Sequence, residues 1–242
     1  MTTIVKFLIT LLLGVLLTSC KAEFNSSQGL KGNGKVITKN REVYKSFTKI
    51  KASEGLEIFL TQDSKNSIDV QADENIHQYI ITEVIDGTLE LHTSEQLGKA
   101  NAKKVFVNFK TINEIISSSG ANVITSDIIE TKELIIKASS GSMQQISIVS
   151  GNIGCTSSSG ANIRLKGETE KINATASSGS FIDALKLISE KCETKTSSGA
   201  NINVFCSSEI NSSASSGSNT IYGGNPKKVN KSKSSGAKIS SY

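Results

Sequence analysis

Residues 158–179 read SSGANIRLKGETEKINATASSG, so that one Ser-Ser-Gly triplet leads through a strand-like stretch to the next triplet. The triplet occurs seven times, and its glycines are Gly120, Gly141, Gly160, Gly179, Gly199, Gly217 and Gly236. Subtraction gives spacings of 21, 19, 19, 20, 18 and 19 residues. A short and nearly fixed period with strand-like content indicates stacked supersecondary units, because no single unit could bury its apolar face alone.

The residues between the triplets form columns when they are counted from each glycine. The column seven residues before the glycine is mostly aliphatic and contains Leu134, Ile153, Ile172, Cys192, Ile210 and Val229. The columns five and three residues before it are mostly small or hydroxyl-bearing, and the column three residues after it is again mostly aliphatic. Side chains alternate along a strand, so we expect these columns to point inward together with the second serine of each triplet.

Repetition of these columns stacks like residues on like, about 4.8 Å apart. The sequence therefore predicts an all-β fold, a right-handed parallel β-helix (β-solenoid) with about 19–20 residues per Ser-Ser-Gly repeat and an N-terminal β-rich capping region. We expect the triplet glycine to adopt positive φ where the chain bends. The residue after it alternates between alanine and serine, which predicts a crowded corner.

The first twenty residues predict an export signal and a lipid anchor. Lys6 precedes an apolar run over residues 7–17 that is too short to span a bilayer. The run ends at Leu17-Thr18-Ser19-Cys20, which resembles a bacterial lipobox and implies cleavage before Cys20 and acylation of that cysteine. The alternative is an ordinary signal peptide in which Cys20 has no special role.

Composition divides the chain into four regions. We expect a signal peptide at 1–19, a lipidated cysteine and flexible tether at 20–34, a capping β region at 35–110 and the repeat solenoid at 111–242. The tether assignment depends on its glycine, serine and asparagine content. The capping assignment depends on period-two alternation and on a concentration of aromatic residues that predicts a fuller core.

Several motifs in their order resemble a known family of Gram-negative lipoproteins that carry an autotransporter adhesin head GIN domain. They are Phe47-Thr48-Lys49-Ile50, Gly55-Leu56-Glu57-Ile58, the Ile-Asp-Val-Gln-Ala-Asp run at 68–73, Gly87-Thr88-Leu89 and the triplets. The resemblance covers about residues 35 to 240. It implies a β-helical adhesin of the Gram-negative cell envelope, lipid-anchored at the outer membrane, with no catalytic residues to carry over.

Charge and side-chain chemistry argue against nucleic acid binding and against catalysis. The formal net charge is +5 and falls to +4 once Lys6 leaves with the signal, which is too slight and too scattered for nucleic acid. A glycan-active β-helix would need carboxylates that recur in one column. The acidic residues of the repeat occupy different offsets, and Asp63, Asp69 and Asp73 lack a calcium-loop pattern and are predicted to be solvated. We therefore predict no catalytic residue, no metal site and no cofactor.

The cysteines of the repeat are predicted to be buried thiols. Cys155 and Cys192 lie in different columns two rungs apart, near 10 Å by rung spacing and beyond the roughly 7 Å limit for a disulfide. Cys206 lies past a corner from Cys192, so a pair between these two would require a shifted register. The interpretation is three apolar fillers, with a Cys192–Cys206 bond as the alternative.

The outward face of the strand that leads into each triplet is the candidate binding surface. It presents hydroxyl and amide groups, and the candidate residues are Thr156, Ser158, Asn173, Thr175, Ser177, Asn211, Ser213, Ser215, Asn230 and Ser232. Such an array predicts an adhesive module that binds a glycan, an extracellular matrix or another polymer through many weak hydrogen bonds. Two alternatives stay open: a merely solvated sheet face, and a structural envelope component that self-assembles or packs on a protein partner.

Overall fold

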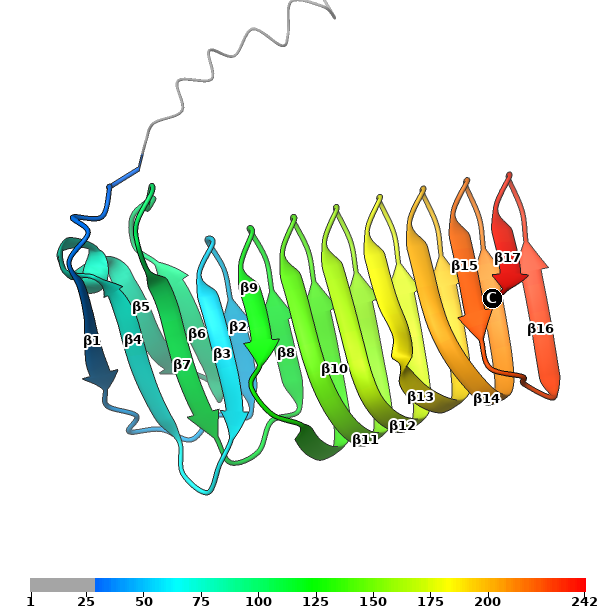
Figure 1. Ribbon diagram of the computed structural model, residues 1–242, viewed down its shortest axis with the longest axis horizontal. Coiled ribbons are helices and arrows are strands. Elements are labelled where there is room, and N and C mark those ends of the chain that lie inside the picture. The colour runs from blue at the N-terminus through cyan, green and yellow to red at the C-terminus, as the bar shows by residue number, and fades with distance from the viewer. Residues whose placement is uncertain (1–28) are drawn as a thin grey trace, which may run out of the picture.

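A computed structural model describes residues 29–242 as one long stack of strands with a wider cap at its N-terminal end (Figure 1). Cys20 and the rest of the predicted signal and anchor lie outside the described residues. Among residues 29–242, no helix is long and apolar enough to cross a membrane.

Each Ser-Ser-Gly triplet forms a tight turn, and the turns align along one edge of the stack (Figure 1). In the turn at 158–161, the N–H of Ala161 donates to the carbonyl oxygen of Ser158 at 3.0 Å. Ser159 and Gly160 both have positive φ, 49° and 70°, as a type I′ turn requires. The N–H of Gly160 also donates to the carbonyl oxygen of Ser178 in the next turn, at 3.1 Å. The turns therefore form a hydrogen-bonded ladder of their own.

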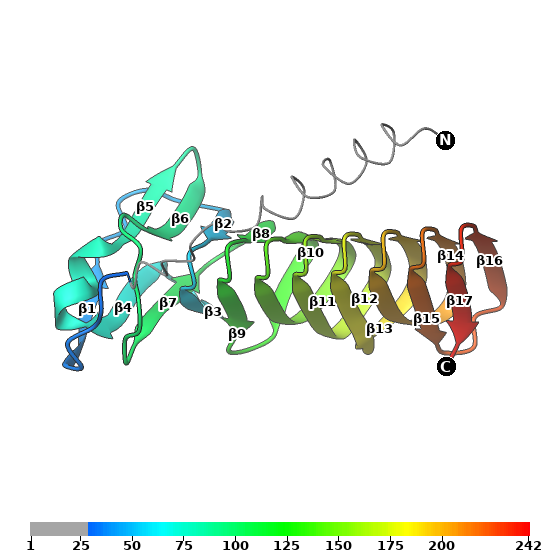
Figure 2. The ribbon, with the colours of Figure 1, turned by 90° about the horizontal axis from the view of Figure 1, so that it is seen from above.

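Two parallel sheets run from this edge. The incoming face contains the strands before each turn and the outgoing face the strands after it, and Figure 2 shows them as separate layers. Strands β11 to β14 are long enough to contribute their first halves to the outgoing face and their second halves to the incoming face. The solenoid strands are β2 (Lys49–Ala52), β3 (Glu57–Gln62), β8 (Glu114–Ser117), β9 (Asn122–Thr125), β10 (Ile129–Ala138), β11 (Met143–Ser157), β12 (Asn162–Ala176), β13 (Phe181–Thr196), β14 (Asn201–Ala214), β15 (Asn219–Gly223), β16 (Lys228–Lys233) and β17 (Lys238–Ser241).

The predicted columns are in register and fill the interior. Ile153 pairs with Ile172, which pairs with Cys192 and then Ile210, and all four are buried. The last rung departs from the prediction, because Val229, Lys231 and Lys233 are exposed on β16. Lys231 instead places its Nζ 4.6 Å from the ring centre of Tyr222, over the open end of the core.

Near the turns, the interior is polar and hydrogen-bonded. The hydroxyl of Ser142, directly after a turn glycine, donates to the carbonyl oxygen of Ser117 at 3.1 Å and lies 2.8 Å from the Ser117 hydroxyl. Ser180 and Ser218 make the corresponding bonds to Ser157 and Thr196. These serines stand in every second rung, so the Ala/Ser alternation adds a hydrogen bond between rungs in alternate turns.

One expectation about the turn is wrong, and another, a crowded corner at the residue after the glycine, is confirmed. The second serine of each triplet points outward, because its positive φ turns it away from the strand plane, and Ser159 is exposed. Gly160 also lies in open space, since a Cβ added there would meet no atom within 4 Å. The crowding falls on the following residue, and Ala161 is fully buried.

The cap is mixed β structure built outward from the first solenoid rung. On one side β1 (Val36–Arg41) and β7 (Lys103–Phe109) pair antiparallel with β4 (Ser67–Asp73), and β7 pairs parallel with β3. On the other side, β5 (Ile80–Ile85) and β6 (Thr88–Thr93) form a hairpin whose β6 pairs parallel with β2. A short 3-10 helix, η1 (Glu74–Tyr79), connects the two sides.

The cap and the solenoid are interleaved in sequence, unlike the predicted division at residue 110. Ser53-Glu54-Gly55 forms a turn of the same kind, and the N–H of Gly55 donates to the carbonyl oxygen of Ser119 at 3.0 Å. Strands β2 and β3 on either side of this turn pair with β8 and β9 of the next rung. The chain thus forms the first rung of the solenoid with β2 and β3, then forms the cap, and then returns to form the next rung with β8 and β9.

Residues 29–34, assigned to the flexible tether by composition, pack on the cap. Leu30 forms a β-bridge with Leu97, and the N–H of Gly34 donates to Oδ2 of Asp73 at 2.7 Å. Oδ1 of Asp73 accepts the N–H groups of Asn101 and Ala102 at 3.0 Å each. Asp73 is therefore a fully buried junction of the cap and not the solvated residue that the sequence predicts.

The cysteine prediction is also wrong in its main form. Cys192 and Cys206 form a disulfide with a Cα–Cα distance of 6.1 Å, which was the alternative. The register between β13 and β14 shifts around Ser189. These shifts bring Cys206 close to the corner that precedes Cys192. Cys155 remains a buried free thiol, and burial raises its pKa.

Candidate binding surfaces

The predicted polar surface lies where expected, on the outward side of the incoming face. Its ten residues come from β11, β12, β14, β16 and the first serines of three turns, and all are exposed or half-buried. Thr156, Thr175, Lys195, Ser213 and Ser232 form one in-register column across five rungs. The structure thus brings the predicted residues onto one continuous face.

Charges and internal bonds interrupt this surface. Glu193 lies 3.5 Å from Lys195 and 3.9 Å from Lys171, in the middle of the array. Asn230 donates through Nδ2 to Oδ1 of Asn211 at 2.8 Å. A shallow depression of about 280 Å³ lies among these side chains toward β16. Free hydrogen-bonding groups therefore cluster at the threonine and serine positions.

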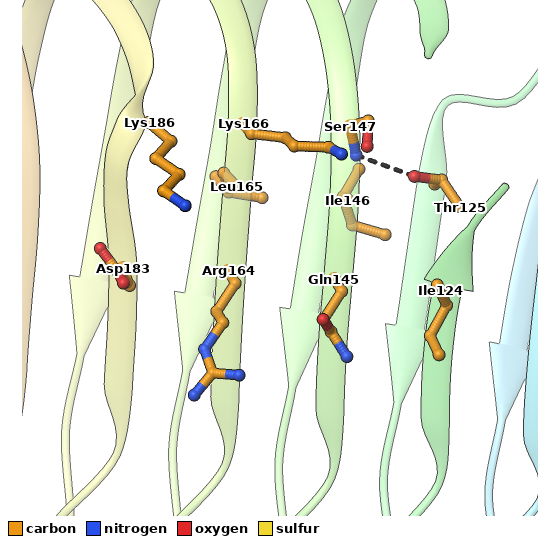
Figure 3. Close-up of a pocket in the computed structure, with 10 residues that line it drawn as sticks. All are labelled: Ile124, Thr125, Gln145, Ile146, Ser147, Arg164, Leu165, Lys166, Asp183 and Lys186. Atoms are coloured by element: carbon orange, nitrogen blue, oxygen red, sulfur yellow. Dashed lines mark hydrogen bonds between the residues drawn. The ribbon is translucent and has the colours of Figure 1, made fainter. Parts of the chain in front are cut away.

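A second surface, on the outgoing face, was missed by the sequence analysis. A hollow of about 520 Å³ opens across β9, β11, β12 and β13, and Figure 3 shows its lining side chains. The polar groups around it are Gln145, Arg164, Lys166, Asp183 and Lys186. Column counting could not reveal this hollow, because the cations occupy different offsets from their glycines.

A β-bulge shapes the hollow. Arg164 pairs with Asp183, but the next outward pair is Lys166 with Lys186, so β13 carries one extra residue at this level. Oδ1 of Asp183 accepts the N–H of Leu185 at 3.3 Å inside the bulge. Gly167 follows at φ 124°, and a Cβ there would lie 1.9 Å from the carbonyl oxygen of Ile148. Close backbone contact between β12 and β11 thus requires glycine at 167.

Other titratable groups of the described residues include both histidines, which lie in the cap. Within residues 29–242, no group of three or more His, Cys, Asp or Glu side chains could hold a metal ion. His92 lies 3.5 Å from Glu83 on the cap hairpin. His77 is buried in the cap, between the carbonyl oxygen of Val70 and the guanidinium of Arg41. These contacts are structural.

A family profile described as "Putative auto-transporter adhesin, head GIN domain" matches residues 46–226, from just before β2 to just before β16. The chain belongs to this family. The match covers both the cap and the solenoid and agrees with the resemblance seen in the sequence motifs. No curated protein sequence matches the chain.

Solved structures share the fold at low sequence identity. A putative adhesin from Bacteroides fragilis NCTC 9343 is similar with a TM-score of 0.82 and 21% identity, over 88% of this chain and 100% of that one. A putative lipid binding protein from Parabacteroides distasonis ATCC 8503 gives 0.72 and 18%, over 88% and 99%. A putative adhesin from Parabacteroides merdae ATCC 43184 gives 0.70 and 20%, over 88% and 98%. At these identities the similarity establishes the fold alone.

Proposed function

We propose that this protein is a non-catalytic adhesion module of the bacterial cell envelope that holds an extended polymer, such as a glycan, against its incoming face. One observation carries the proposal: an outward column stands in register across five consecutive rungs, with hydroxyl side chains in four of them and Lys195 in the middle one. The family description and the names of two of the similar structures, putative adhesins, support the same class.

Repetition supplies the affinity in this proposal. A single hydroxyl contact contributes only about 0.5–1.5 kcal/mol, because it replaces a hydrogen bond to water. Rungs spaced about 4.8 Å apart present the same group repeatedly, so a polymer with a short repeat engages several of them together. The rigid ladder of turns and sheets fixes these positions before binding, which reduces the entropy lost on association.

Substitution of Thr156, Thr175 and Ser213 by lysine tests this surface. The three positions are outward and exposed, so the fold should persist while bulky charges disrupt the array. Adhesion of cells that display the full chain should fall far more than with any single replacement. The matched control exchanges the same residues among hydroxyls, as Thr156→Ser, Thr175→Ser and Ser213→Thr. Undiminished adhesion by the lysine variant would show that this face is only solvated.

We further propose that Cys20 anchors the chain by its acyl groups at the outer membrane, in keeping with the lipobox-like Leu17-Thr18-Ser19-Cys20. More than one acyl chain on one residue gives stable membrane attachment, whereas a single chain binds marginally. Cys20→Ala should therefore release the protein from membranes or leave its signal uncleaved. Membrane fractionation and intact mass measure this, and an unchanged mature mass in the membrane fraction would contradict the anchor.

A structural role is the second candidate, and the end of the solenoid favours it. In the described part of the chain, β16 pairs with β14 alone, and all six of its residues are exposed. An open strand edge can pair with another copy and extend the stack. Sedimentation of the full chain over a range of concentrations separates the candidates, since end-to-end assembly requires growth in mass with concentration.

A further inference from the structure

We propose that the hollow on the outgoing face binds an acidic polysaccharide, whose carboxylate or sulfate groups lie on Arg164, Lys166 and Lys186 while its sugar rings extend toward Phe59 and Phe106. This site lies on a different face from the adhesive surface proposed above and does not depend on it. Three features of the outgoing face support this site: cations without an ion pair, a β-bulge beside the hollow, and an aromatic platform in the column of Arg164.

The cations of the hollow, Arg164, Lys166 and Lys186, form no ion pair with a described residue. Lys166 and Lys186 stand directly opposite each other in register, an arrangement in which like charges destabilise a sheet. With Asp183 as the one carboxylate of the lining, three cations less one anion leave a local charge of +2. An anion in the hollow would remove this repulsion.

The shape of the hollow suits a ligand that lies across the strands. The bulge at Leu185 inserts one extra residue of β13 between the Arg164 level and the Lys166 level, beside the hollow. In Figure 3, Lys166 extends over the neighbouring strand toward Ser147, whose N–H donates to Oγ1 of Thr125 at 2.8 Å. Arg164, Lys166 and Lys186 are exposed around the hollow, and in Figure 3 their side chains extend in three different directions, where a ligand from solvent can reach them.

An apolar platform continues the same column toward the cap. Phe106, Phe59, Ile124, Gln145 and Arg164 are successive register partners across β7, β3, β9, β11 and β12. The two phenylalanine rings stack with centroids 5.0 Å apart, and Phe106 is 37% exposed. Three strand spacings, roughly 14 Å, separate Phe59 from Arg164, which is the reach of a short oligosaccharide.

A ligand that carries both sugar rings and anionic groups would fit both the aromatic end and the cationic end of this column. An exposed aromatic face offers a surface against which the apolar face of a pyranose can pack. Arg164 can bind a planar carboxylate or a sulfate with two parallel hydrogen bonds, and the lysines add point charge. A free inorganic anion would use only the cationic end, and a neutral glycan only the aromatic end.

Binding measured by calorimetry on the purified full chain tests the proposal. The probes are an oligogalacturonate tetrasaccharide, neutral maltotetraose, inorganic sulfate and phosphatidylglycerol vesicles. We expect oligogalacturonate to bind and maltotetraose not to bind, with affinity falling as salt is raised. The variant Arg164→Gln, Lys166→Gln, Lys186→Gln should lose affinity on the order of a hundredfold, since charge-assisted hydrogen bonds are the strong ones.

Two further variants localise the effect. Replacing Lys191, Lys227 and Lys228 by glutamine removes the same charge from other exposed positions and should leave oligogalacturonate binding unchanged. Phe106→Ala should weaken oligogalacturonate roughly tenfold but leave sulfate binding as in the parent. The lysine variant of Thr156, Thr175 and Ser213 should bind oligogalacturonate normally, so a failure of the adhesive proposal is seen separately.

Three results would overturn the proposal. Equal oligogalacturonate affinity for the parent and the Arg164/Lys166/Lys186 variant would show that these three cations do not bind the ligand. An equal loss in the charge-matched control would show unspecific attraction. Binding of vesicles without binding of oligogalacturonate would identify a lipid headgroup as the anion. Circular dichroism and melting of each variant check that the fold is retained, and we expect the triple variant to melt no lower than the parent because it removes like-charge repulsion.

Discussion

At the scale of single residues, Gly160 in a Ser-Ser-Gly turn and Gly167 in strand β12 have different structural roles. Gly160 supplies only a backbone conformation, because its surroundings are open. Gly167 supplies both a conformation and space, since the carbonyl oxygen of Ile148 occupies the place of its missing side chain. The sequence alone predicts positive φ at Gly160. The close contact between Gly167 and the carbonyl oxygen of Ile148 depends on how two rungs stack, which the sequence does not show.

We therefore predict unequal effects of alanine at these two glycines. Gly160→Ala should lower the free energy of unfolding by about 1 kcal/mol, the cost of a non-glycine residue at positive φ. Gly167→Ala should cost several-fold more, because backbone atoms of β11 and β12 must move apart. Thermal or urea melting measures both. Similar losses at the two sites would mean that β11 and β12 can separate at Gly167 without strain.

At the scale of elements, the cap depends on buried polar contacts and not only on its aromatic core. His77 is buried, and its Nε2 must donate to the carbonyl oxygen of Val70 at 3.0 Å because that oxygen can only accept. Its Nδ1 then accepts from Nη2 of Arg41 at 2.9 Å, since a guanidinium can only donate. Burial, followed by the charges of Arg41 and Lys39, lowers the pKa of His77 below 6.5.

Acidification should accordingly weaken the cap. The native state keeps His77 neutral to a lower pH than the unfolded chain does, so the unfolded chain binds more protons between the two pKa values. The contribution is complete above about pH 6.5 and is lost as the pH falls toward the lower, native pKa. Hydrogen exchange of β1 and β4 between pH 7 and pH 5 measures this loss. His77→Gln should show less of it, and an equal pH response in that variant would assign the effect to other groups.

The disulfide joins the incoming strand to the next outgoing strand at the irregular corner. Cys192 and Cys206 are 14 residues apart in sequence, and closing a loop of about 15 residues contributes about 3 kcal/mol in the chain-entropy account. The double variant Cys192→Ala, Cys206→Ala should lower the melting temperature, and a reductant should then have no further effect. Cys155→Ala removes a buried free thiol but keeps the disulfide, so this control variant should stay as sensitive to reductant as the parent. Equal sensitivity of all variants to reductant would contradict this role.

Elements that repeat could be predicted from the sequence, and elements that break the repeat could not. The inward columns follow from alternation within a strand, and Ile153, Ile172 and Ile210 are buried as expected. The rung at Ser53-Glu54-Gly55 could not be predicted from the triplet, because glutamate replaces the second serine, although its turn has the same backbone conformation. The disulfide and the cationic hollow both arise from register slips around β13, which depend on how two unequal rungs pair and are not visible in either one alone.

At the scale of the whole molecule, the two ends of the stack are protected differently. At the cap end, β1 and β5 finish the two sides with antiparallel pairs, while at the other end β16 and β17 each pair with a single strand of the described chain. The two long faces also differ, since one carries hydroxyls and amides and the other a cationic hollow. A rigid solenoid of this kind can thus present two chemically distinct surfaces at fixed distance from its cap.

We predict that the lysines of the last rung prevent the open end of the solenoid from pairing with another copy. Lys228, Lys231 and Lys233 are exposed on β16, where an incoming copy would have to place its own strand beside them, and bringing like charges together opposes that pairing. Replacing the three lysines by threonine removes the repulsion and retains β propensity, so the variant should associate end to end at concentrations where the parent does not. Sedimentation velocity measures the change, and lysine-to-threonine substitution at Lys110, Lys132 and Lys166, away from the edge, controls for the loss of net charge. A variant that sediments like the parent at every concentration would show that these lysines are not what prevents pairing at this edge.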